Sequence, residues 1–407
     1  MKIWSRLVLL ALATTSMVGC LRDDDEPTLP SRPISRLYIS TSEYQPTNNT
    51  QGLENVYLVE PADAELFDTI SRRFRTNALG GSAVVYSPEA QLLFQSGQNV
   101  RAVDNSIQVY SVDTLRGSLA QRGVITSELL TAVRSLVYHP NRDLLFAPNS
   151  AAAPTGTIPT ISPTSVMAQV GATQSDLYVY RRPSSKNGIS LPTYRIPFTN
   201  RTVYALFVHD LSIRPEETRN RTYVSTYNSS STDILVYNEL TEKLVNSPDS
   251  VRRDINPDFT LSVPTARNLT SMAYSPTLDL MVATEAPVGS PGRILFFNEF
   301  SKHTGDSQIA PDRVISGGQS QLGSPSSVSI DKREGAQYIY VANASVDISG
   351  AVSGVLRFNI NDEGGVAPNA VLQIAGRTPV GVSLDARGTI PEDGGGSDTT
   401  RATVRRR

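Results

Sequence analysis

Residues 83–94, AVVYSPEAQLLF, decide the fold, because the chain returns to this pattern twice without gaps. The two further copies are residues 135–146 (SLVYHPNRDLLF) and 271–282 (SMAYSPTLDLMV), and all three contain a tyrosine, one residue, a proline, three residues and a leucine. Weaker copies are residues 205–210 (ALFVHD), 327–331 (SVSID) and 381–385 (GVSLD). A unit that recurs along a whole chain is typical of architectures in which each unit packs against its neighbours.

Each copy predicts a short apolar strand, a tight turn and a second strand, because proline fixes φ at the turn. A third strand of β-branched and aromatic residues follows, as at 107–110 (IQVY) and 234–237 (ILVY). A more polar fourth strand, as at 193–198, suits an outer edge. Four antiparallel strands per repeat predict an all-β β-propeller. We expect six four-stranded blades; the alternatives are a seventh blade in residues 151–174 and a pair of β-sandwich domains.

The two ends of the repeat region complement each other. Residues 379–385 supply only a first strand, whereas residues 36–40 have the pattern of a second strand with no first strand before it. Closing the ring with these two segments removes open sheet edges. The sequence therefore predicts a single domain over residues 36–388, in which Val380–Leu384 pairs antiparallel with Leu37–Ser40.

The amino terminus has the pattern of an export signal. Lys2 and Arg6 precede an apolar run, residues 7–13 (LVLLALA), which is too short to span a bilayer, where about 20 residues are needed. Residues 17–20 (MVGC) resemble the lipobox of bacterial lipoproteins. The resemblance implies a signal peptide at residues 1–19, acylation of Cys20, and lipid anchoring at the outer membrane on its periplasmic or cell-surface side.

Two further segments flank the repeats. Residues 20–35 contain the acidic run 23–26 (DDDE) and three prolines, which indicates an extended tether. Residues 389–407 are of low complexity and are expected to form a disordered tail.

The repeat itself resembles a known group. Residues 325–358 (PSSVSIDKREGAQYIYVANASVDISGAVSGVLRF) and the segment 310–316 (APDRVIS) are similar to YncE-like and lactonase-like propeller repeats. The resemblance implies the fold and leaves the activity open, because this scaffold hosts binding proteins and enzymes alike.

Composition excludes several function classes. The net charge of −2 gives no basic footprint for nucleic acid. With one cysteine and three histidines, we expect no metal site, no cofactor and no catalytic residue. The lone tryptophan, Trp4, lies in the signal, which argues against quinoprotein propellers. The aspartates that recur at turns, such as Asp331 and Asp385, are expected to be structural.

The sequence favours a non-enzymatic binding or scaffold module, a monomer that recognises a glycan, a peptide or a protein. The alternative is a lactonase-like hydrolase with its site at the tunnel mouth. Long insertions fall between second and third strands, whereas the other connections are expected to be mostly short, so loop length would be concentrated on one face of the disc. On that face we expect binding by Asn149, Asn228, Asn343, Gln98 and Thr284. Local capping of strand ends is the competing interpretation of the three asparagines.

Overall fold

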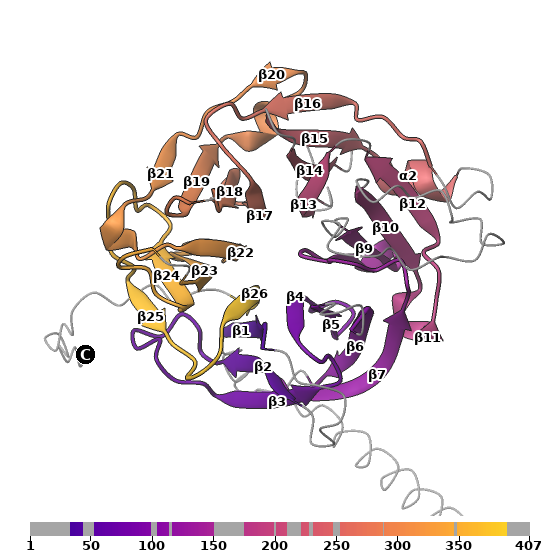
Figure 1. Ribbon diagram of the computed structural model, residues 1–407, viewed down its shortest axis with the longest axis horizontal. Helices are drawn as coiled ribbons and strands as arrows, with labels where there is room; N and C mark the ends of the chain where they lie inside the picture. The colour runs from indigo at the N-terminus through magenta and orange to yellow at the C-terminus, as the bar shows by residue number, and fades with distance from the viewer. Residues whose placement is uncertain are drawn as a thin grey trace, which may run out of the picture. The chain divides into compact units, whose positions relative to one another are not determined.

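Six sheets, each built on four antiparallel strands, follow one another around a central axis (Figure 1). The computed structural model describes residues 33–43, 53–98, 104–113, 116–149, 175–198, 201–209, 221–227, 231–246, 253–287, 289–345 and 348–388. Within these residues the fold is a six-bladed β-propeller, as the sequence predicts. The signal peptide, Cys20, Asn228 and the insertion 151–174 lie outside the described residues.

Each blade has four strands, which follow one another from the centre of the ring outwards. In that order, blade 1 contains β26 (Pro379–Arg387), β1 (Ile34–Thr41), β2 (Leu53–Val59) and β3 (Arg72–Thr76). Blade 2 contains β4 (Gly81–Ser87), β5 (Leu92–Gly97), β6 (Ser106–Val112) and β7 (Leu119–Thr126). Blade 3 contains β8 (Val137–His139), β9 (Leu144–Asn149), β10 (Ser175–Arg181) and β12 (Tyr194–Phe198).

The other three blades repeat the plan. Blade 4 contains β13 (Thr202–His209), β14 (Arg221–Tyr227), β15 (Thr232–Asn238) and β16 (Phe259–Ser262). Blade 5 contains β17 (Leu269–Ser275), β18 (Leu280–Glu285), β19 (Arg293–Asn298) and β21 (Arg313–Ile315). Blade 6 contains β22 (Ser324–Ile330), β23 (Tyr338–Ala344), β24 (Gly354–Asn359) and β25 (Ala370–Leu372).

The hydrophobic core lies between blades, because each blade is covered on both faces. Along β1, Leu37 and Ile39 pack towards blade 6 in a cluster with Tyr340. Tyr38, which points to the other face, packs towards blade 2 with Tyr86. This arrangement explains why the middle strands are apolar on both faces and do not alternate between apolar and polar residues.

Ring closure occurs as predicted. β26 pairs antiparallel with β1, and the register places Leu37 opposite Leu384 and Ser40 opposite Gly381. Blade 1 is therefore assembled from both ends of the domain, which leaves no open strand at the start or end of the ring.

Serine hydroxyls join the innermost strands of neighbouring blades. Ser383 Oγ accepts a hydrogen bond from Tyr86 N (2.9 Å), and Ser329 Oγ accepts one from Leu384 N (3.1 Å). Ser327 and Ser271 repeat the contact to the next blade. These hydroxyls satisfy backbone donors at strand edges that have no further strand beside them.

The prediction that loop length is concentrated on one face is wrong. Connections between third and fourth strands, such as residues 239–258 and 299–312, are as long as most second-to-third connections. They are long because they reach the neighbouring blade: β11 (Asn187–Ile189) of the blade 3 connection pairs with β7, and β20 (Ser307–Gln308) of the blade 5 connection pairs with β16. Two blades thus carry a fifth strand.

Gly123 permits one of these approaches. A Cβ atom at this position of β7 would lie 2.4 Å from the carbonyl oxygen of Lys186, just before β11.

The described residues contain one short α-helix, α2 (Leu240–Val245), and no helix among them is long and apolar enough to cross a membrane.

Candidate functional site

Asn149 and Asn343 occupy the same register position, near the ends of the second strands of blades 3 and 6. Both side chains are buried. Asn149 Oδ1 accepts hydrogen bonds from the backbone N–H groups of Thr131 (2.8 Å) and Ala132 (3.2 Å). Asn343 Oδ1 accepts one from Gly323 N (3.0 Å), and its Nδ2 donates to Val352 O (2.7 Å). Each amide thereby fixes the connection that enters the innermost strand of its own blade.

Other blades place a carboxylate at this position. In blade 5, Glu285 is fully buried and accepts hydrogen bonds from Arg267 N and Arg293 Nε. In blade 2 the position is Gly97, and the space that a Cβ would fill holds the carboxyl group of Asp104. Burial raises the pKa of Asp104, although hydrogen bonds from backbone N–H groups, including that of Gly80 (3.0 Å), oppose the shift. The sequence showed no such equivalence, because Asp104 comes from the loop after the strand.

The remaining predicted site residues lie apart. Thr284 is fully buried in blade 5, with its Oγ1 2.9 Å from Thr270 Oγ1. Gln98 is exposed beside blade 2, and its backbone N–H donates to Gly80 O (2.7 Å). The four described residues belong to four different blades, so a joint role in binding stays a prediction.

A groove of about 470 Å³ lies at the seam where blade 6 meets blade 1. Its walls come from β2, from the loop and strand around β3, and from the segment after β25. The side chains that line it include Glu54, Tyr57, Asp68, Arg73, Gln373 and Arg377. We call this feature the seam groove. It presents acids, guanidinium groups and an amide to the same space, a composition suited to polar recognition.

Tyr57 forms the electrostatic centre of the seam groove. Burial raises the pKa of its phenol, while the positive charges of Arg377 and Arg73 act in the opposite direction. Arg377 also hydrogen-bonds the phenol, and the Tyr57 hydroxyl donates to Glu54 O (2.9 Å). Two guanidinium groups therefore converge on one phenol.

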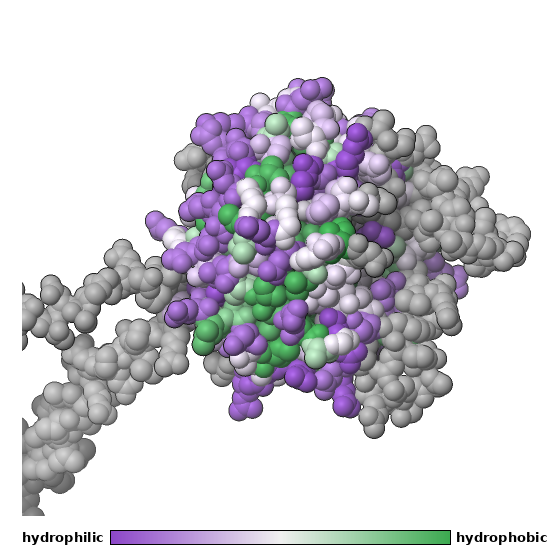
Figure 2. All heavy atoms as spheres, turned by 60° about the vertical axis from the view of Figure 1, so that its left-hand side comes forward, coloured by the Kyte–Doolittle hydropathy of each residue, from purple (hydrophilic) through white to green (hydrophobic). Residues whose placement is uncertain are grey.

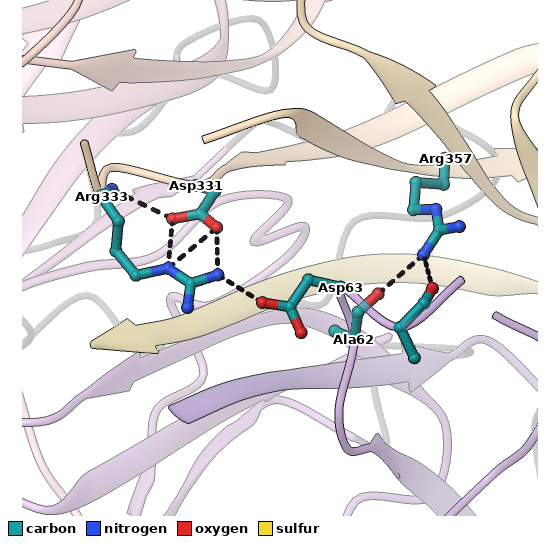
Figure 3. Close-up of polar contacts among 6 residues, drawn as sticks. Ala62, Asp63, Asp331, Arg333 and Arg357 are labelled. Carbon is teal, nitrogen blue, oxygen red and sulfur yellow. Dashed lines mark hydrogen bonds and ion pairs between the residues drawn. The ribbon is translucent and has the colours of Figure 1, made fainter. Parts of the chain in front are cut away.

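The face of the disc opposite the one that holds Asn149 and Asn343 carries a repeated Asp-x-Arg ion pair. We call each such pair a clamp and this face the clamp face. Asp331 pairs with Arg333 (2.5 Å) at the end of blade 6, and Asp385 pairs with Arg387 (2.7 Å) at the equivalent place in blade 1. Arg333 also reaches Asp63 of blade 1 at 2.6 Å (Figure 3). The recurring aspartates are thus ion-paired within their own blades, and Arg333 extends one of these pairs to blade 1, which supports the structural role expected from the sequence.

Arg357 provides a second set of contacts between blade 6 and blade 1. It is 1% exposed, and its guanidinium donates to Ala62 O at 3.1 Å (Figure 3). It also donates to Ala64 O (2.5 Å) and Glu65 O (3.0 Å) in the same blade 1 loop. It also lies 4.3 Å from the centre of the Tyr338 ring. The only sequence signal for this contact was an arginine within an apolar strand.

Charged side chains of blades 6, 1 and 2 interact with one another near the ends of the innermost strands, on the clamp face of the disc. Burial raises the pKa of Asp385, opposed first by Arg387. Lys332 and Glu89 are both exposed there, and the negative charge of Glu89 favours the charged form of Lys332. Glu89 also acts on Asp385, so the three blades contribute interacting charges to one tunnel mouth.

These polar groups do not form a metal centre within the described ranges. No group of three or more His, Cys, Asp or Glu side chains there is placed to hold a metal ion. The rim on the side of β21 and β25 has hydrophilic margins around a hydrophobic area (Figure 2).

Comparisons with known proteins find similarity only to solved structures of low sequence identity. No protein-family model matches it, and no curated protein does. A solved structure of a nidogen/laminin complex matches with 9% identity and a TM-score of 0.48, covering 86% of this chain and 98% of that one. A Bacteroides fragilis protein described as a candidate 6-phosphogluconolactonase matches with 10% identity and a TM-score of 0.46, covering 88% and 100%. The periplasmic gluconolactonase of Pseudomonas aeruginosa matches with 12% identity and a TM-score of 0.47, covering 88% and 100%.

Proposed function

We propose that the protein is a lipid-anchored propeller of the bacterial cell envelope that binds a polar partner, a glycan, a peptide or a protein, without catalysing a reaction. The observation that carries the binding role is the seam groove, where hydrogen-bonding groups of both charges line one space. The structural use of Asp331 and of the other clamp residues supports the same role, because it leaves their charges engaged within the ring. The lipid anchor rests on the lipobox resemblance at Cys20.

Replacement of the acylated residue tests the anchor. We expect Cys20→Ser to move the protein from the membrane fraction to the soluble fraction, because acyl chains alone would hold it. Immunoblots of fractionated cells measure the change. Retention of the Ser variant on membranes through an alkaline wash would refute the anchoring proposal.

Two substitutions in the seam groove test the binding role. We expect Asp68→Ala combined with Arg377→Ala to weaken capture of the envelope partner by roughly tenfold, since each truncation removes a charge-assisted contact. The matched control is Arg142→Ala, which removes an exposed arginine on another part of the ring. Equal capture by the double variant and the control would contradict the assignment of the groove.

The alternative is a lactonase-like hydrolase. One observation favours it: the interacting charges of Lys332, Glu89 and Asp385 at the clamp-face mouth of the tunnel. A screen of lactones and esters with the full chain decides between the two functions. Turnover that disappears in Glu89→Gln and Lys332→Met, and persists in the seam groove variant, would establish the hydrolase.

A further inference from the structure

The outer strands of the blades are covered in a regular way. A segment from the third-to-fourth connection of the next blade lies along each covered strand. β11 and β20 run parallel to β7 and β16 in blades 2 and 4. In blade 5, Ile315 forms a parallel bridge with Gly364, and in blade 3 Arg253 N donates to Arg195 O (2.8 Å).

Blade 6 is covered by side chains. The blade 1 connection packs Phe67 into the same buried cluster as Leu372 of β25 and Ile374. Five blades thus receive a cover from the blade that follows them in the ring.

Blade 1 lacks a backbone cover, although Leu119 at the start of β7 packs against the same buried cluster as Phe74 of β3. Its outer strand β3 would be covered by the connection 113–118 of blade 2, but that connection closes on itself: Asp113 N donates to Ser118 O (2.9 Å) and Gly117 N to Asp113 O (2.6 Å). In the part of the chain that the structure describes, no strand and no backbone hydrogen bond occupies the outer edge of β3.

The uncovered edge is strongly basic. β3 has the sequence RRFRT, and Arg72, Arg73 and Arg75 are all exposed. Among the described residues, no carboxylate lies within ion-pair distance of Arg72 or Arg73. Charge on an edge strand discourages pairing with a second copy of the same strand, because arginines would face arginines. The same charge attracts an acidic strand.

We propose that the outer edge of β3 receives an extended acidic segment of a partner protein, which adds as a fifth strand. The orientation is parallel, as it is for β11 on β7 and β20 on β16. Backbone hydrogen bonds to β3 supply the affinity, and pairing of acidic side chains with Arg72 and Arg73 selects the partner. This surface is separate from the partner binding assigned to the seam groove, although Arg73 borders both.

A model peptide tests the proposal on the full chain. The probe is a capped peptide of alternating glutamate and valine, about ten residues long. We expect it to bind and to slow hydrogen exchange at the backbone amides of β3, with no change at β7 or β16, whose edges are already occupied. Arg72→Glu combined with Arg73→Glu weakens binding at least roughly tenfold, because two attractive charges become repulsive.

Two controls test whether binding depends on the edge of β3 and on the acidic side chains of the peptide. The first is Arg122→Glu, which reverses an exposed arginine on the covered strand β7 and leaves binding within about twofold. The second is a peptide with lysine in place of glutamate, which does not bind. Peptide binding without slower exchange in β3 would overturn strand addition. A second result would also overturn the proposal: slow amide hydrogen exchange in β3 without any peptide, which becomes fast when residues 21–32 are deleted. It would show that the chain's own acidic run occupies the edge of β3.

Discussion

Deletion from Arg377 onward is expected to abolish cooperative folding, whereas deletion from Thr389 onward leaves the melting temperature within about 2 °C of that of the intact chain. The longer deletion removes β26, the innermost strand of blade 1, which pairs with β1 from Ile34 to Thr41. It also removes Ser383 and the buried residues Val382 and Asp385. The shorter deletion begins after the last strand of the ring.

Thermal unfolding followed by circular dichroism measures both truncations. The physical reason for the contrast is that a ring without its closing strand exposes the inner edge of β1 and the parts of β22 and β4 against which β26 packs. Similar melting temperatures for the two truncations would show that the pairing of β1 with β26 is dispensable.

Replacement of Arg357 by methionine is expected to destabilise the fold by about 3–5 kcal/mol, because one buried and two part-buried carbonyl groups lose their donor together. Methionine retains much of the apolar volume against Tyr338, so the loss is assigned mainly to hydrogen bonds. Chemical denaturation gives the free energy of unfolding.

The matched control for Arg357→Met is Arg142→Met. Arg142 pairs with Glu242 at 2.9 Å, but its side chain is 47% exposed, so its loss should cost about 0–1 kcal/mol. A cost for Arg357→Met no larger than that of the control would mean that the blade 1 loop does not depend on this guanidinium.

The parts of the fold that local sequence determines were predictable. The Tyr-x-Pro turns and the β-branched runs predicted the strands, and the leftover strands at the two ends predicted that Val380–Leu384 pairs with Leu37–Ser40. The serine contacts between blades were not predictable, because they depend on how far one innermost strand slides along the next.

The seam groove shows the same limit for the candidate site. Tyr57 and Arg377 are far apart in sequence and meet only because the ring closes at their blades. The asparagines were visible as a repeated position, but their partners, such as Thr131 and Gly323, lie in connections with no recognisable pattern. Connection length was misjudged because a segment that crosses to another blade has the composition of a loop.

The crossing connections impose an order on the growing chain. β11 adds to the outer edge of blade 2 but is part of the blade 3 connection, which is synthesised later. In the same way, β20 adds to blade 4 but is part of the blade 5 connection. Blades 2 and 4 therefore emerge with their outer edges unpaired until the following blade has been synthesised. Unpaired margins invite association with other nascent chains. Blade 1, the first to be synthesised, is completed last, because its innermost strand β26 is made after all the other strands of the ring.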